Sequence, residues 1–129
     1  MDIRSVLVAV DPHSSSYASL QYAVELCKRF EATLVGIAAE ELNLPLAGMD
    51  ASGVAIDFYN LERTEIEKRL RAAEAHFRAS VPSEVRSEWR ARIANPSHAV
   101  VDAARTADLI IAGHGAAQHA DARRSVSLG

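Results

Sequence analysis

The chain has few of the residues that small proteins use when they cannot build a hydrophobic core. Cys27 is the only cysteine, so no disulfide can form within the chain. The sequence nevertheless has 129 residues, of which 49% are hydrophobic. A chain of this length and composition can bury a core without disulfides or metals. The scarcity of cysteine suits a reducing compartment, and we expect a cytoplasmic protein.

Long apolar runs and a basic excess are also missing. The first apolar run, residues 6–10, stops at Asp11 and Pro12 and does not resemble a signal peptide. No stretch approaches the roughly 18 uncharged apolar residues that a membrane helix needs. The 14 basic residues are outnumbered by 17 acidic ones, which gives a net charge of −3. No surplus of positive charge is available to neutralise a phosphate backbone, so we expect neither nucleic acid nor membrane as a partner.

Motifs for catalysis are scarce as well. The sequence contains no Gly-Lys-Ser/Thr phosphate loop, no nucleophile elbow and no paired Cys/His set. A phosphotransfer enzyme would need an acid that holds a metal and a positioned base, and only Asp11 stands where such a group is expected. The sequence therefore predicts no catalytic residue and no metal site, and it favours binding over catalysis.

What the chain does contain is a regular alternation of strand and helix patterns. Residues 6–10 are continuously apolar, which is typical of a strand that is buried on both faces. Residues 32–38 predict a second buried strand, and 108–112 predict the fourth strand in the chain. Residues 85–91 alternate apolar with polar side chains instead, which predicts a strand at an edge or half covered. Helices are predicted after the serines at 14–16, over about 54–79, and from Asn95 and Pro96 onward, where the asparagine would cap the helix.

In two of the predicted helices, the spacing of apolar residues indicates which side faces the core. In the first, Cys27 and Phe30 fall on the buried side. In the second, an apolar stripe is predicted to be buried, and it consists of Ile56, Tyr59, Ile66, Leu70, Ala73 and Phe77. Glu65 and Arg69 stand four residues apart in the favourable order, which predicts an ion pair on a solvated face.

The order of these elements predicts the fold class. Strands that alternate with helices indicate an α/β domain over 1–129, with a doubly wound parallel sheet, right-handed crossovers and helices on both faces. After Ala112 no further apolar strand is recognisable. Three explanations stay open: an unprotected sheet edge, a natural chain that continues beyond Gly129, or a partner chain that covers the edge.

Four segments together resemble the universal stress protein family: 6–11, 32–38, 93–96 and 107–113. The resemblance covers nearly the whole chain in register. It implies a Rossmann-like, adenine nucleotide alpha hydrolase-like fold with strand order 3-2-1-4-5, whose fifth strand is missing from the sequence pattern. Many members bind ATP or AMP and others do not. The resemblance thus implies a stress-response module that binds ATP, with Mg²⁺, or AMP at the carboxyl ends of the first and fourth strands.

The family pattern assigns two ligand-binding positions at the ends of neighbouring strands. Asp11 fits the position that contacts the nucleoside, and Ile37 fits the position whose backbone meets the adenine. Open α/β sheets bind their ligands at this edge. A structural role for Asp11, capping the turn together with Ser14, is the alternative.

The phosphate loop of the family departs from its pattern here. Nucleotide-binding members have glycine, two residues, glycine, nine residues, then glycine and serine or threonine. The same register in this chain gives Gly113, Ala116, Val126 and Ser127. Val126 is the harder replacement, because a β-branched residue disfavours positive φ and crowds an anion. Gly115 in a shifted alignment could restore part of the loop, and Arg123 or Arg124 could supply charge.

The resemblance leaves more than one function open. It implies dimerisation, and some related chains carry two such domains in tandem, so a homodimer or a tandem-domain partner is expected. The first function is a nucleotide-responsive module, and the second is a dimerisation or partner-binding module without nucleotide. For the second, the apolar residues of the predicted loop 39–53 would form the contact surface, namely Leu42, Leu44, Leu46 and Met49. A weak ATPase is the third.

Overall fold

The computed structural model of the protein describes residues 2–13, 18–42 and 53–112. Strands and helices alternate along these ranges, as the sequence predicts. In chain order they are β1 (Ser5–Ala9), α1 (Ala18–Phe30), β2 (Thr33–Glu40), α2 (Gly53–Ser80), β3 (Ser87–Ile93), α3 (Pro96–Ala104) and β4 (Leu109–Ile111).

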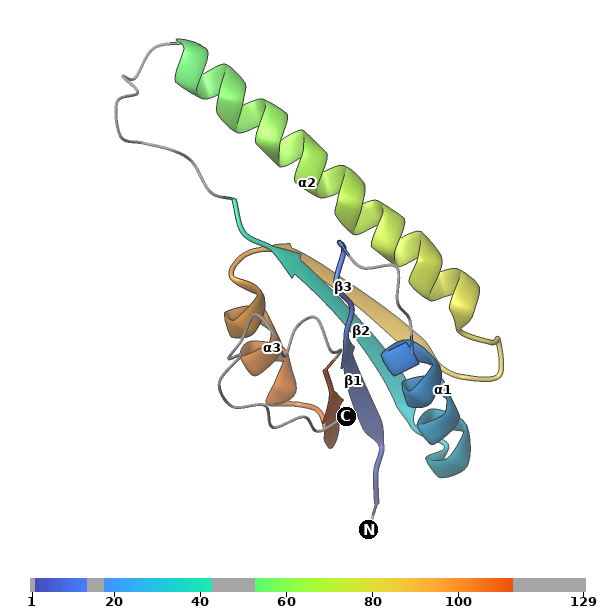
Figure 1. Cartoon of the computed structure of the whole chain (residues 1–129). Helices are drawn as coiled ribbons and strands as arrows, with labels where there is room; N and C mark the ends of the chain where they lie inside the picture. Colours follow the sequence, from blue (N-terminus) through green and yellow to red (C-terminus); the bar gives the residue numbers. More distant parts are fainter. Residues whose placement is uncertain (1, 14–17, 43–52, 113–129) are drawn as a thin grey trace.

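The four described strands form one parallel sheet in the order β3-β2-β1-β4. Helices α1 and α2 cover one face of the sheet and α3 covers the other (Figure 1). This confirms the doubly wound α/β fold. The winding reverses at β1, because β2 and β3 lie on one side of it and β4 on the other. Any fifth strand would come from residues after 112, which lie outside the described ranges.

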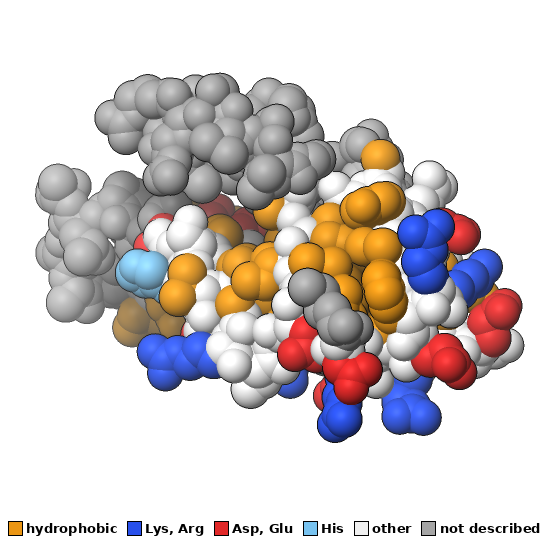
Figure 2. All heavy atoms as spheres, turned by 90° about the horizontal axis from the view of Figure 1, so that it is seen from below, with side chains coloured by type: hydrophobic (Ala, Val, Ile, Leu, Met, Phe, Trp, Pro, Cys, Tyr) orange, Lys and Arg blue, Asp and Glu red, His pale blue; other side chains and the backbone are white. Residues whose placement is uncertain are grey.

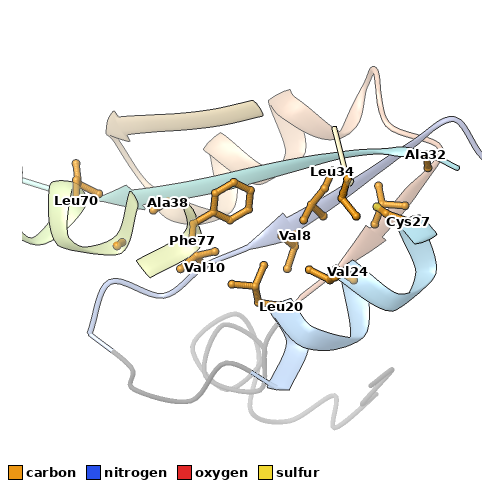
Figure 3. Close-up of a cluster of buried hydrophobic side chains, with 14 of the residues drawn as sticks. Val8, Val10, Leu20, Val24, Cys27, Ala32, Leu34, Ala38, Leu70 and Phe77 are labelled. Atoms are coloured by element: carbon orange, nitrogen blue, oxygen red, sulfur yellow. The ribbon is translucent and has the colours of Figure 1, made fainter. Parts of the chain in front are cut away.

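The larger core lies between the sheet and helices α1 and α2 (Figure 3). Its largest fully buried side chain is Phe77 of α2, which lies over Gly36 of β2. A Cβ on Gly36 would stand 2.5 Å from Cε1 of this ring. Trp89 of β3 is the register partner of Gly36, and its ring centroid lies 5.1 Å from that of Phe77. A glycine in the middle of β2 therefore makes room for an aromatic pair.

The second core lies under α3. Leu7, Val35 and Ile37 of the sheet pack there against Ala99 and Ala103, whose small side chains let the helix approach closely. The predicted start of this helix is confirmed. The Asn95 side chain accepts a hydrogen bond from the His98 backbone amide at 3.1 Å, and Pro96 is the first helical residue.

The end of α1 differs in part from the prediction. Cys27 is buried, as expected, but Phe30 is 39% exposed. Glu31 adopts a left-handed φ of 54°, and the Ala32 amide donates to the Cys27 carbonyl at 3.0 Å. This is the hydrogen bond of a Schellman helix end. Phe30 belongs to the last turn before the chain bends into β2, so its ring is only partly covered.

The apolar stripe of α2 is buried over only part of the helix. Ile66, Leu70, Ala73 and Phe77 are buried, but Ile56 is 59% exposed. The physical reason is length. A helix of 28 residues spans about 42 Å, whereas the eight residues of β2 span about 26 Å. The first half of α2 extends past the sheet (Figure 1). Neither α2 nor any other described helix is long and apolar enough to cross a membrane.

Asp108 joins the amino-terminal ends of β1 and β4. Its Oδ2 accepts hydrogen bonds from the backbone amides of Arg4, at 2.8 Å, and Ser5, at 3.1 Å. Its own amide donates to the Ser5 carbonyl at 3.1 Å. Together these bonds fix the start of the β1–β4 register, in which Val6 is the partner of Leu109.

Candidate functional site

Asp11 stands two residues after the end of β1, at the edge where the parallel strands finish. Its Oδ1 accepts a hydrogen bond from the His13 backbone amide at 2.9 Å, which is the arrangement of an Asx turn. The alternative role, capping of the turn, is therefore present, with His13 as the donor; Ser14 lies outside the described residues. Among the described residues, no donor reaches the second carboxylate oxygen. One oxygen thus orients the turn, and the contact of Asp11 with a nucleoside stays a prediction.

Ile37 lies in β2, next to this turn. Its carbonyl accepts the Val10 amide at 2.8 Å, which continues the β1–β2 ladder beyond Ala9. Its side chain is buried beneath α3. The side chain is therefore a packing residue, and the contact between the Ile37 backbone and adenine stays a prediction.

The remaining predicted site residues follow β4 in the sequence. Gly113, Gly115, Ala116, Arg124 and Ser127, together with Val126, lie outside the described residues. The structure shows where this segment starts. Ile111, the last residue of β4, is the register partner of Val8 in β1. β4 therefore ends beside β1, the strand that Asp11 follows by two residues, and the role of the segment after Ala112 in binding phosphate stays a prediction.

A second polar group at this edge was not predicted from the sequence. Glu40 is the last residue of β2, and only 14% of its side chain is exposed. Arg69 of α2 donates to it with two nitrogens, Nε to Oε1 at 2.9 Å and Nη2 to Oε2. This two-pronged contact is the strongest way in which arginine holds a carboxylate. It ties the middle of α2 to the end of β2.

His13 links this pair to the turn of Asp11. Its Nε2 lies 3.1 Å from Oε1 of Glu40. The hydrogen bond from Arg69 is the main cause that lowers the pKa of Glu40 below its ordinary value of 4.5, against burial, which raises it. The positive charge of Arg69 and the contact with His13 lower this pKa further. Glu40 in turn raises the pKa of Arg69, so both groups are ionised at neutral pH.

The predicted pairing of Arg69 with Glu65 on a solvated face is wrong. Glu65 instead contacts Lys68, at 3.6 Å. Arg69 follows Ile66 by three residues and precedes Leu70, both of which are buried. It therefore stands at the border of the stripe that faces the sheet. That position, together with an acidic residue at a strand end, is the signal that would have indicated the Glu40 contact.

The opposite end of the sheet carries a cavity of about 270 Å³. Arg4, Thr33, Glu88 and Arg90 contribute to its wall, near the amino-terminal ends of the strands. Figure 2 shows the molecule from this end, with apolar side chains gathered centrally and charges of both signs along the rim. Asp11 is not among the residues that line the cavity. No described group of three His, Cys, Asp or Glu side chains is placed to hold a metal ion there or elsewhere. We assign it no ligand.

Comparison with known sequences gives a family. The model described as "Universal stress protein family" matches residues 2–127, almost the whole chain. A search of curated proteins finds no match.

Comparison with solved structures gives the same fold. Universal stress protein UspA from Lactobacillus plantarum is 20% identical with a TM-score of 0.58, and the match covers 88% of this chain and 78% of that one. A universal stress protein family member from Burkholderia pseudomallei is 23% identical with a TM-score of 0.59, covering 96% and 91%. A universal stress protein crystallised in complex with cAMP is 21% identical with a TM-score of 0.53, covering 85% and 71%.

Proposed function

This chain belongs to the universal stress protein family, and from that premise we propose that it is a stress-response module that binds an adenine nucleotide, ATP or AMP. The site lies at the carboxyl ends of β1 and β4. One observation carries the proposal: the turn after β1 holds the Asp11 carboxylate at the point where the winding of the sheet reverses. Open α/β sheets bind ligands at such switch points.

The surroundings of Asp11 support this choice of edge. The carboxylate would accept a hydrogen bond from a nucleoside hydroxyl with the oxygen that does not bond to the His13 amide. The described chain ends at Ala112, directly after β4, which pairs with β1. The residues that follow in the sequence, from Gly113 onward, would hold the phosphates, with Mg²⁺ accompanying ATP. The structural neighbour that was crystallised with cAMP is a precedent for an adenine nucleotide in a protein of this fold.

Isothermal titration calorimetry of the full chain with Mg-ATP, AMP and cAMP tests the proposal. We expect saturable binding of at least one nucleotide, weakened about 10-fold or more in Asp11→Ala, since a hydrogen bond to a charged group is lost. Asp11→Asn can still accept from the His13 amide, so it separates the charge of Asp11 from its turn. Asp57→Ala, at an exposed position of α2, is the matched control. Absence of binding at millimolar nucleotide, or equal binding by Asp11→Ala, contradicts the proposal.

A dimerisation or partner-binding module is the second candidate. It is favoured by apolar side chains on the first half of α2, where Ile56, Phe58 and Leu61 are exposed. A strictly monomeric protein that captures no partner would exclude this function. A weak ATPase ranks third, and turnover that is unchanged in Asp11→Ala would exclude the site described above as its active centre.

A further inference from the structure

The outer edge of β3 is an open strand edge. β3 is seven residues long and pairs with β2 on one side, and within the described ranges no strand lies on its other side. Such an edge offers unpaired amides and carbonyls to another strand. The Leu34 amide donates to the Arg86 carbonyl, and the Ala94 amide donates to the Glu40 carbonyl. The even-numbered residues therefore face β2. The groups that point outward belong to Ser87, Trp89, Ala91 and Ile93.

The exposed side chains of β3 have a charge pattern that complements itself. Glu88 and Arg90 are exposed on the face of the sheet that α3 covers, on either side of Trp89. If a second copy of β3 runs antiparallel with Trp89 opposite Trp89, Glu88 lies opposite Arg90 of the second copy, and Arg90 lies opposite its Glu88. These are the non-hydrogen-bonded positions, where facing side chains approach most closely. Opposite charges placed there stabilise the pairing.

Other antiparallel registers also keep the odd-numbered residues of the two strands opposite each other, as the hydrogen bonds require, but the neighbouring ones bring like charges together at the axis. Centring the pair on Arg90 places Arg90 opposite itself, and centring it on Glu88 places two glutamates together. In the register centred on Trp89, the like-charged contacts are the two symmetry-related ones between Arg86 of one copy and Arg92 of the other, at the ends of the strand. Arg92 is already held by Asp102, with 3.1 Å between Nη1 and Oδ2. The register centred on Ser87 also places opposite charges together, Glu88 with Arg86, but in it Ser87 is the only residue of β3 that faces β3 of the second copy. Among the registers that pair three or more residues of each β3, the one centred on Trp89 places only opposite charges around the two-fold axis.

We propose that β3 binds β3 of a second copy of this chain, antiparallel and about a two-fold axis through Trp89, so that two four-stranded sheets become continuous. The contact is isologous, as two-fold symmetry requires. Charges on an edge strand commonly prevent such pairing. Here both signs are present two residues apart, so opposite charges meet beside the two-fold axis in this register. The proposal goes beyond nucleotide binding, because β3 is separated from β1 and Asp11 by β2.

Charge reversal gives the first test. Analytical ultracentrifugation should show a concentration-dependent dimer, and Trp89, the only tryptophan, should change its emission on dilution. Glu88→Arg and Arg90→Glu each create two like-charged contacts and should weaken the dimer about 10-fold or more. The double variant E88R/R90E exchanges the charges and should restore it. Glu84→Arg makes the same change at an exposed position outside β3 and should leave the dimer unaffected.

Disulfide trapping tests the register. Glu88→Cys mixed with Arg90→Cys should form a cross-linked heterodimer on mild oxidation, whereas either variant alone should not. Cys27 will not compete, because it is buried and burial raises the pKa of its thiol to about 11. A protein that stays monomeric at all concentrations overturns the proposal. So does a dimer that neither single charge reversal weakens, or a mixture that forms no heterodimer.

Discussion

Gly36 decides how closely α2 can approach the sheet. The Phe77 ring occupies the space that any side chain at this position would need. Trp89 flanks the same space from β3. The contact between Phe77 and Trp89 therefore depends on a glycine at position 36, because any Cβ there would clash with the Phe77 ring.

We expect Gly36→Ala to lower the free energy of unfolding by about 1–3 kcal/mol, the usual cost of an overpacked core. The added Cβ would stand 2.5 Å from a ring atom that belongs to the buried core. Urea unfolding that is followed by Trp89 fluorescence measures the loss. Phe77→Leu alone should also lower the free energy of unfolding. In the double variant, however, Gly36→Ala should cost less than it does in the wild type, because the ring that the added methyl would meet is gone. If the losses of the two single variants simply add in the double variant, the clash is not with the Phe77 ring.

Single residues were predictable where a local rule applies. The Asn95 cap and the buried Cys27 follow from sequence spacing, and both are confirmed. Glu31 was not predictable, since its left-handed φ occurs at a helix end where glycine is the usual residue. The turn of Asp11 was one of two alternatives, and sequence alone could not identify His13 as the donor.

At the level of elements, the contact between Glu40 and Arg69 joins β2 to α2. Glu40→Gln should lower the free energy of unfolding at pH 7 by about 1–2 kcal/mol, since the hydrogen bonds to charge are largely shielded from water. Glu74→Gln is the control, because it removes an exposed pair with Arg78 at 3.4 Å. That change should cost no more than about 0.5 kcal/mol.

The dependence on pH distinguishes charge from packing. Folding lowers the pKa of Glu40 below its ordinary value of 4.5. The stabilisation is therefore fully present above that value and is lost as pH falls through the lower pKa of the folded state. Urea midpoints of the wild type and Glu40→Gln should converge below about pH 4.5. A difference that stays constant from pH 7 to pH 3 would mean that the carboxylate charge is not involved.

Elements were predicted correctly in type, and their surroundings were predicted less well. Alternating residues at 85–91 predicted an edge or half-covered strand, and β3 lies at the edge of the described sheet. The stripe on α2 was predicted to be buried along its length, but Ile56 is exposed. Helical periodicity reports which side of a helix is apolar. The reach of the sheet beneath it depends on residues far away in the sequence.

At the scale of the whole molecule, Cys27 is a natural probe of global unfolding. It is 2% exposed in the main core, and burial raises its pKa to about 11. We expect a thiol reagent to modify it only as fast as the molecule unfolds, with rates that rise steeply in urea. Glu25→Cys, at an exposed position of the same helix, is the control and should react at once. Rapid labelling of Cys27 in native buffer would indicate local opening of α1.

The position of Asp11 was predictable for the same reason as the fold, because the family pattern and a general rule for α/β sheets both point to the residue that follows the first strand. Its contact with a nucleotide stays a prediction. Glu40 and Arg69 were missed because their contact joins segments 29 residues apart through the tertiary fold. The loop positions from Gly113 to Ser127 stay predictions.

The bonds between Ser5 and Asp108 have a consequence for the synthesis of the protein. These residues are 103 positions apart, and a ribosome adding about 5–20 residues per second would need about 5–20 s to cover that distance. During this time β1 can pair with β2, and β2 with β3, but the other side of β1 has no partner. β1 is thus among the first strands made and among the last to gain both of its neighbours in the sheet, and one of its edges stays open until β4 is made.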